Sequence, residues 1–158
     1  MTYPDTIVSQ ATPQGYSGIA VLRLSGSTAL ATAIKISKTK RPLAPMKATL
    51  LPIYDHKGTR VDKGIFIYYK APKSYTGEDV IEISCHGNPL ICKTIINTAR
   101  HHGLRIAEPG EYTRRAFLNG KLSLSQAESI SLLISSRTKE ALKTVSYTHL
   151  TLPTSSQV

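Results

Sequence analysis

The sequence predicts an α+β fold, in which two helices pack on one side of a mixed β-sheet and the start of a helical domain follows. Short apolar runs between glycines, such as 19–24, are typical of buried strands. Residues 47–70 have the pattern of a hairpin with a turn at 56–58. Helix start and stop signals at Asn88 and Gly103 enclose an amphipathic stretch, so strands and helices share one domain.

The first elements are separated by turn-forming residues. Residues 5–11 predict a short strand, and the proline- and glycine-containing segment 12–18 predicts the turn before the strand at 19–24. Residues 25–27 (SGS) end that strand and can cap a helix over 28–37. A basic, proline-containing connection then leads to the hairpin.

The next strand, 79–84 (DVIEIS), places a carboxylate inside an apolar run. We expect Val80, Ile81 and Ile83 to lie in the core, whereas Glu82 needs another explanation. In the helix that follows, Asn88 is the predicted N-cap and Pro89 the first helical residue. Its predicted apolar stripe consists of Leu90, Ile91 and Ile95.

The C-terminal third predicts a short strand at 104–107, one or two helical turns at 112–118, and a longer helix from Ser125. Ser125 and Glu128 have the spacing of a capping box. The apolar positions that follow have helical spacing and form a face too long to be buried alone: Ala127, Ile130, Leu133, Ile134 and Ala141. The predicted division is a domain at 1–121, the first helix of a truncated helical domain at 122–145, and a tail at 146–158.

The chain is strongly basic, with 20 Lys and Arg residues against 10 Asp and Glu and a formal charge of +10. Such a charge favours phosphate-rich or carboxylate-rich partners, but a solvated basic surface accounts for it equally well. Two cysteines do not make a disulfide framework, and neither a secretory signal nor an apolar run of membrane-spanning length is present. We therefore expect a reduced, cytoplasmic protein that does not enter a membrane.

No motif typical of catalysis or metal binding can be recognised in this sequence. Gly120-Lys121 resembles the end of a P-loop, but Arg115 stands where the first glycine belongs and Leu122 replaces Ser or Thr. The chain itself is therefore not expected to hydrolyse GTP. The cysteines and histidines match no zinc pattern, and Cys92 lies on a predicted amphipathic helix, so a structural cysteine is the better interpretation.

Two charged residues interrupt apolar strands, namely Arg23 in 19–24 and Glu82 in 79–84. Burying an unmatched guanidinium costs several kcal/mol, so such an arginine is seldom unpaired. A structural salt bridge between the two residues explains the pattern, and so does a polar ligand pocket.

Three segments occur in order: 5–26 (DTIVSQATPQGYSGIAVLRLSG), 74–88 (SYTGEDVIEISCHGN) and 109–128 (PGEYTRRAFLNGKLSLSQAE). Over roughly residues 5–145 the chain resembles the N-terminal region of the tRNA-modification GTPase family MnmE, also called TrmE. The resemblance implies a domain like the tetrahydrofolate-binding domain of one-carbon enzymes, which binds 5-formyl- or 5,10-methylene-tetrahydrofolate and forms a homodimer. It also implies a helical domain with an inserted GTPase domain, whose GTP, Mg and K sites are absent from this chain.

The family acts with an FAD-containing partner, MnmG or GidA, on the wobble uridine of certain tRNAs. Carried over by position, the folate-site residues are Arg23, Glu82 and Lys121, which favours the ligand pocket over the salt bridge. A carboxylate can accept two parallel hydrogen bonds from a pterin ring, and the cations can meet a formyl oxygen or a glutamate tail. The sequence departs from the family pattern at Asn88, where CHGG is usual, and at Ser123, where KLDL is usual, and neither change touches these three residues.

The last residues, 146–158, abandon the family pattern and resemble translated sequencing-adapter sequence. A non-native origin is therefore expected, with a divergent linker or a disordered tail as the alternative. Two other functions compete with the family assignment. A stand-alone basic RNA-binding module would need stacking aromatics on a sheet face, which are not legible. A folate-dependent aminomethyltransferase-like enzyme would need a much longer chain.

Overall fold

The computed structural model describes residues 5–146. Apart from Ser146, the tail for which a non-native origin is predicted lies outside the described residues. None of the described helices is long and apolar enough to cross a membrane.

One six-stranded sheet forms the centre of the domain, with the strand order β3-β4-β5-β2-β1-β6. All neighbouring strands are antiparallel except β1 and β6, which run parallel, so the sheet is mixed as predicted. The strands are β1 (Ile7–Gln10), β2 (Ser17–Ser25), β3 (Thr49–Tyr54), β4 (Arg60–Tyr69), β5 (Val80–Gly87) and β6 (Arg105–Ile106).

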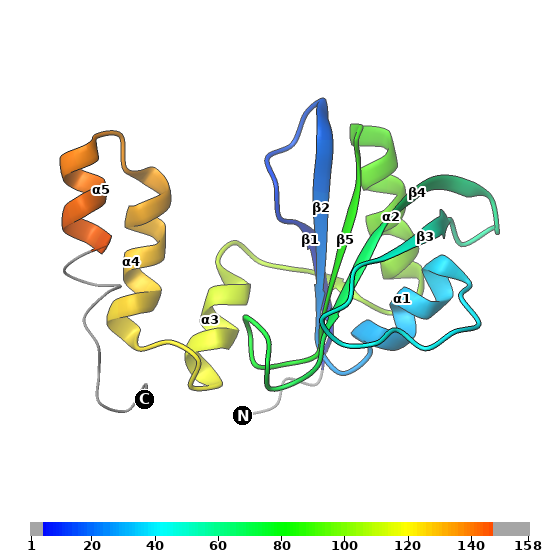
Figure 1. Cartoon of the computed structure of the whole chain (residues 1–158), viewed down its shortest axis with the longest axis horizontal. Coiled ribbons are helices and arrows are strands. Elements are labelled where there is room, and N and C mark those ends of the chain that lie inside the picture. Colours follow the sequence, from blue (N-terminus) through cyan, green and yellow to red (C-terminus); the bar gives the residue numbers. More distant parts are fainter. Residues whose placement is uncertain (1–4, 147–158) are drawn as a thin grey trace.

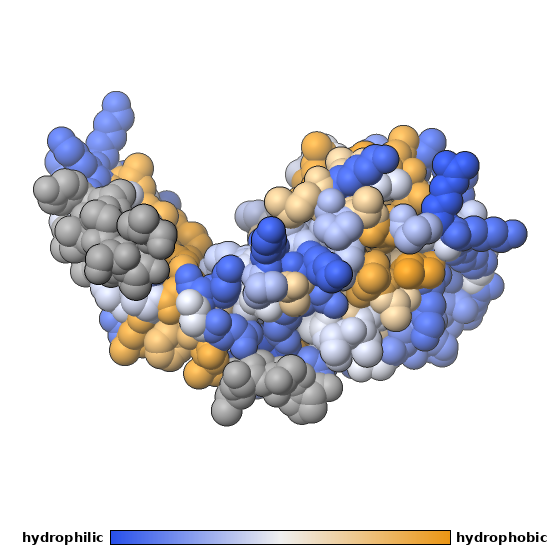
Figure 2. Space-filling model, turned by 60° about the horizontal axis from the view of Figure 1, so that its bottom comes forward, coloured by the Kyte–Doolittle hydropathy of each residue, from blue (hydrophilic) through white to orange (hydrophobic). Residues whose placement is uncertain are grey.

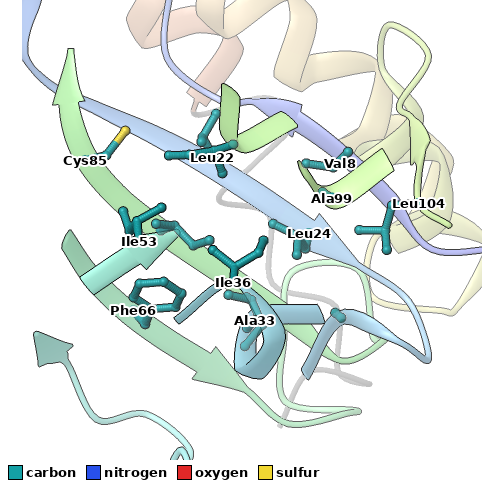
Figure 3. Close-up of a cluster of buried hydrophobic side chains, with 14 of the residues drawn as sticks. Val8, Leu22, Leu24, Ala33, Ile36, Ile53, Phe66, Cys85, Ala99 and Leu104 are labelled. Atoms are coloured by element: carbon teal, nitrogen blue, oxygen red, sulfur yellow. The ribbon is translucent and has the colours of Figure 1, made fainter. Parts of the chain in front are cut away.

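Two helices, α1 (Ala29–Ser37) and α2 (Pro89–His101), cover one face of this sheet (Figure 1). Their apolar sides and the alternate residues of the strands form the core, in which Ile36, Phe66 and Ala99 are fully buried (Figure 3). The predicted α+β fold, with two helices on one side of a mixed sheet, is therefore confirmed.

The start of α2 is also confirmed, because the side chain of Asn88 accepts a hydrogen bond from the backbone N–H of Leu90 at 2.8 Å and Pro89 is the first helical residue. The predicted stripe is wrong at Leu90, which is 72% exposed. Leu90 lies too far round the helix from Ile95 to face the sheet.

The predicted cap of α1 is wrong. The helix begins after Thr28, which makes no side-chain cap. Ser25 turns instead toward the loop before β5. There its hydroxyl is hydrogen-bonded to the hydroxyl of Thr76 at 2.8 Å and donates to the carboxylate of Glu78 at 3.1 Å. The hydroxyl of Thr6 accepts the hydrogen bond of the Thr28 N–H at 3.0 Å.

Three further helices lie on the other side of the sheet (Figure 1): α3 (Glu111–Leu118), α4 (Leu124–Ser135) and α5 (Lys139–Val145). The capping box of α4 joins Ser123 to Gln126, so the predicted start at Ser125 is two residues late. The predicted single helix is interrupted, because Ser136 is extended with ψ 132°. Ala141 therefore belongs to a second helix.

Candidate functional site

A row of polar side chains crosses the face of the sheet that α1 and α2 do not cover. In the strand register, Ser9 is opposite Arg23, Arg23 is opposite Glu82, and Glu82 is opposite Ile67. Neighbouring residues of these strands, such as Leu22 and Ile83, are fully buried in the core. Because successive side chains of a strand point to opposite faces, the two charges stand on the face away from α1 and α2.

Arg23 and Glu82 form an ion pair in the middle of this row. The Nε and Nη2 atoms of Arg23 donate to the same oxygen, Oε1 of Glu82, at 3.2 and 3.0 Å. Both side chains keep about a quarter of their surface exposed, at 24% and 26%. Within residues 5–146 the other carboxylate oxygen, Oε2, accepts no hydrogen bond, so the pair can still accept donors from a ligand.

Two tyrosine rings flank the guanidinium of Arg23. Its central carbon lies 5.3 Å from the ring centre of Tyr75 and 5.4 Å from that of Tyr112, distances typical of cation–π contacts. The Tyr112 hydroxyl donates to the Arg23 carbonyl at 2.6 Å and accepts from Ser9 at 3.1 Å. Burial raises the pKa of Tyr112 to about 12, so its phenol stays protonated and holds Arg23 by a neutral hydrogen bond.

A cavity of about 490 Å³ opens beside these side chains and is lined by Arg23, Tyr75 and Tyr112 as well as by Ile130 and Ile134 of α4. Its volume is in the range of about 300–1,000 Å³ that small-molecule sites occupy. In the space-filling view of Figure 2 the surface is hollowed between the arm that contains α4 and α5 and the body of the sheet. The flanked arginine therefore borders a space large enough for a ligand.

Lys121 does not touch this ion pair. It follows α3 and is exposed, and its backbone N–H donates to the Ala116 carbonyl at 2.8 Å. Within residues 5–146 no hydrogen bond or ion pair joins its side chain to another residue. Its aliphatic part lies along Gly77, since a Cβ atom at Gly77 would stand 3.3 Å from Cγ of Lys121. Lys121 thus packs on the loop that also carries Tyr75, and its amino group has no competing partner there.

An ionic cluster that the sequence analysis missed holds α3 in place. Arg115 is completely buried and contacts Glu111 at 3.0 Å, Glu78 at 3.2 Å and Asp5 at 2.7 Å. Arg105 contacts Glu111 at 2.6 Å and Asp5 at 2.7 Å from the other side. The spacing of Glu111 and Arg115 by four residues was the one available signal. The cluster joins α3 to β6, to the loop before β5 and to the start of β1.

Burial by itself raises the pKa of Glu111, but the hydrogen bonds from Arg105, from the Glu108 N–H and from Arg115 outweigh it and lower the pKa to about 2. The lowered pKa means that the ionised form stabilises the folded state above pH 4.5, the ordinary value, and that this contribution is lost as the pH falls toward 2. The difference corresponds to about 3 kcal/mol of unfolding free energy.

We therefore expect the free energy of unfolding to fall steeply between about pH 4.5 and 2. The measurement is urea unfolding at a series of pH values, followed by circular dichroism. Glu111→Gln is expected to be less stable at neutral pH and to vary less over this range, whereas the exposed Glu128→Gln should keep the steep fall. Equal pH dependence in Glu111→Gln and the parent would contradict the role of this carboxylate.

The two cysteines belong to the core. Cys85 and Cys92 are each only 3% exposed, and burial raises the pKa of the Cys85 thiol to about 12, which makes it a poor metal ligand or nucleophile. This burial agrees with their interpretation as structural cysteines. Within residues 5–146, no three side chains of the metal-ligating types come close enough together to hold an ion.

Comparison with known proteins gives one consistent result. Residues 6–121 match the family described as "GTP-binding protein TrmE N-terminus". The chain is 51% identical to the tRNA modification GTPase MnmE of Aquifex aeolicus over 139 residues, 88% of this chain and 31% of that protein. For the proteins of the same name, identity is 47% in Wolinella succinogenes and 50% in Francisella tularensis, over 89% and 88% of this chain and 30% of each relative. The chain therefore spans about a third of the length of these relatives.

Proposed function

The chain belongs to the TrmE N-terminus family, and on that premise we propose that it is the cofactor-binding module of a tRNA-modification GTPase. The module binds a reduced folate, 5-formyl- or 5,10-methylene-tetrahydrofolate, beside Arg23 and Glu82. The folate supplies a one-carbon unit for the modification of the wobble uridine in tRNA. The GTPase activity belongs to the part of the relatives that this chain does not span.

The observation that carries this proposal is the half-engaged carboxylate of Glu82. Both hydrogen bonds from Arg23 end on Oε1, so Oε2 can accept a donor from a ligand. A pterin ring offers an N–H and an amino group side by side, a pair of donors that suits a carboxylate. A carboxylate has only acceptor atoms to offer, and the guanidinium of Arg23 already occupies Oε1 of Glu82.

Two cations are available for the polar parts of the folate. Arg23 can meet the formyl oxygen, and the exposed amino group of Lys121 can meet the negatively charged glutamate tail, or the two roles can be exchanged. The cavity of about 490 Å³ is lined by Arg23, Tyr75, Tyr112 and Ile134 but not by Glu82 or Lys121, and its volume suits the aminobenzoyl linker. Tyr75, Tyr112 and Ile134 offer the flat and apolar contacts that such a linker needs.

Calorimetric titration of the chain with 5-formyltetrahydrofolate tests the proposal. We expect saturable binding with one site per chain. 4-Aminobenzoyl-glutamate, which lacks the pterin, is the matched control ligand and should bind far more weakly. Equal affinities for the two compounds, or an absence of binding by the folded chain, would rule out a pterin site at Glu82.

We further propose that the chain forms a homodimer and works with an FAD-containing partner on tRNA. The homodimer is supported by apolar side chains on the open face of β3 and β4, where Leu50 is 54% exposed and its neighbour Ile65 is only half-buried. A sheet face of this kind is stabilised when a second copy removes it from water.

In sedimentation equilibrium at tens of micromolar, we expect a mass of twice the 17.2 kDa of one chain. Leu50→Glu should shift the mass toward the monomer, because it places a charge in the apolar contact. Leu142→Glu, which changes a leucine 45% exposed on α5, is the control and should stay dimeric. A monomeric parent protein would contradict the dimer.

A further inference from the structure

The stretches that contain α1 and α2 carry cations without acidic neighbours. No Asp or Glu occurs in 27–54 or in 86–107, which hold eight of the 20 Lys and Arg residues of the chain. Apart from Arg105, which belongs to the ionic cluster, none of the eight forms an ion pair within residues 5–146. The paired carboxylates lie elsewhere, mostly around α3. The excess positive charge of the protein is therefore concentrated in these two stretches, which contain α1 and α2.

A groove runs along α2 on this layer, with a volume of about 380 Å³. Lys93, Asn97 and Arg100 line one wall, and Gln10 and Gln14 belong to the opposite wall. Spacings of four and seven residues put the first three on one side of a helix with 3.6 residues per turn. The lining of the groove thus combines two cations and three side-chain amides with apolar residues such as Pro89, Ile96 and Ile106.

Three histidine rings gather at the C-terminal end of α2. The ring of His101 stacks on His56 of the β3–β4 turn with centres 4.5 Å apart, and His102 meets His101 edge-on at 5.6 Å. Lys35 of α1 is close enough to His102 to help lower the pKa of that imidazole, after the larger effect of burial. In Figure 2, hydrophilic side chains gather at the same end of the molecule as the β3–β4 turn in Figure 1.

We propose that the groove beside α2 binds the sugar–phosphate backbone of RNA. Lys93 and Arg100 suit phosphate oxygens, and the amides of Asn97, Gln10 and Gln14 can donate to and accept from ribose hydroxyls. No aromatic side chain is among the described residues that line the groove, so bases have no ring to stack on. The groove therefore recognises the backbone and not the sequence.

The groove suits polyanions in general. The choice of RNA among them rests on the proposed function, in which tRNA is the substrate. The groove lies on the layer of α1 and α2, whereas Arg23 and Glu82 stand on the opposite face of the sheet. Gln10 is the one described residue that lines both hollows, whereas Lys93 and Arg100 line only the groove. The two sites can be tested separately in the same chain.

The test measures fluorescence anisotropy of a labelled, transcribed tRNA with the full chain at several salt concentrations. The variant is Lys93→Glu with Arg100→Glu, and the control is Lys139→Glu with Lys143→Glu, which reverses the same charge on exposed positions of α5. We expect the first variant to lose at least about tenfold in affinity and the slope of log K against log salt to fall by about two, one for each phosphate contact. The control should change less than about threefold, because its lysines contribute only long-range attraction.

Equal weakening by both variants would overturn the groove, since net charge alone would then govern binding. An unchanged affinity in the first variant would overturn it too, and so would polyglutamate or anionic vesicles that displace tRNA as effectively as an unrelated RNA does. Titration of both variants with 5-formyltetrahydrofolate keeps this inference separate from the proposed function. If the parent chain binds folate but not RNA, only the proposal of an RNA groove is overturned. If it binds RNA but not folate, only the proposal of a folate site is overturned.

Discussion

Replacing Arg115 by Met is expected to lower the free energy of unfolding by about 3–5 kcal/mol, because the change leaves buried carboxylates without their cation. Arg115 is fully buried and reaches Glu111, Glu78 and Asp5 within 3.2 Å. Arg105 can still neutralise part of the remaining charge, but within residues 5–146 its ion pairs are with Glu111 and Asp5 and not with Glu78. Urea unfolding followed by circular dichroism measures the difference.

Arg114→Met is the matched control, since it removes the adjacent arginine of the same helix. Its side chain is 50% exposed, pairs with the exposed Glu108 at 3.0 Å and reaches Glu111 only at 3.9 Å, so the expected loss is below about 1 kcal/mol. A double variant with Arg115→Met and Glu111→Gln should lose less than the sum of the two single changes, because each removes the partner of the other. If Arg115→Met unfolds at the same urea concentration as Arg114→Met, the cluster does not stabilise the domain.

Replacing Glu82 by Gln is expected to weaken the binding of 5-formyltetrahydrofolate by roughly 10- to 100-fold. The amide keeps a carbonyl oxygen for Arg23 but turns the other acceptor into a donor, which faces the donors of the pterin. Hydrogen bonds to charged groups contribute about 1.5–3 kcal/mol each, and about 1.4 kcal/mol is a factor of ten in affinity. Calorimetric titration measures the change, and circular dichroism checks that the variant folds.

Two comparisons make this result specific. Glu128→Gln removes the same charge from the exposed surface of α4 and should leave the affinity unchanged. Arg23→Lys should cost as much as Glu82→Gln if the flanked guanidinium makes a forked contact, and less if it acts only as a charge. Parent-like affinity in a folded Glu82→Gln protein would make Glu82 a structural partner of Arg23 and nothing more.

Local patterns in the sequence determined much of the fold. The hairpin at 47–70 and the limits of α2 follow from turn and cap residues that lie next to one another in the chain. The alternation in β5 separated Glu82 from its buried neighbours Ile81 and Ile83, as the structure confirms. These features depend on the period of a strand or helix and on the chemistry of its ends, both of which are properties of contiguous residues.

The same reasoning failed where several local signals compete. Ser123 and Ser125 both have a partner three residues later that suits a capping box, and the structure uses Ser123 with Gln126. The break at Ser136 carries no glycine or proline to mark it. The tertiary course of the backbone decides which of two possible capping residues is used and where the helix is interrupted.

Tertiary structure alone decided how distant residues meet. The sequence left a salt bridge and a ligand pocket as alternatives for Arg23 and Glu82, which lie 59 positions apart, and the register of β2 against β5 joined them. The contact of Arg115 with Asp5 spans 110 positions. Strand order and register set such contacts, and no local pattern encodes them. The physical reason is that a buried charge is stable only next to its partner, so the fold selects the partner through the geometry of the whole sheet.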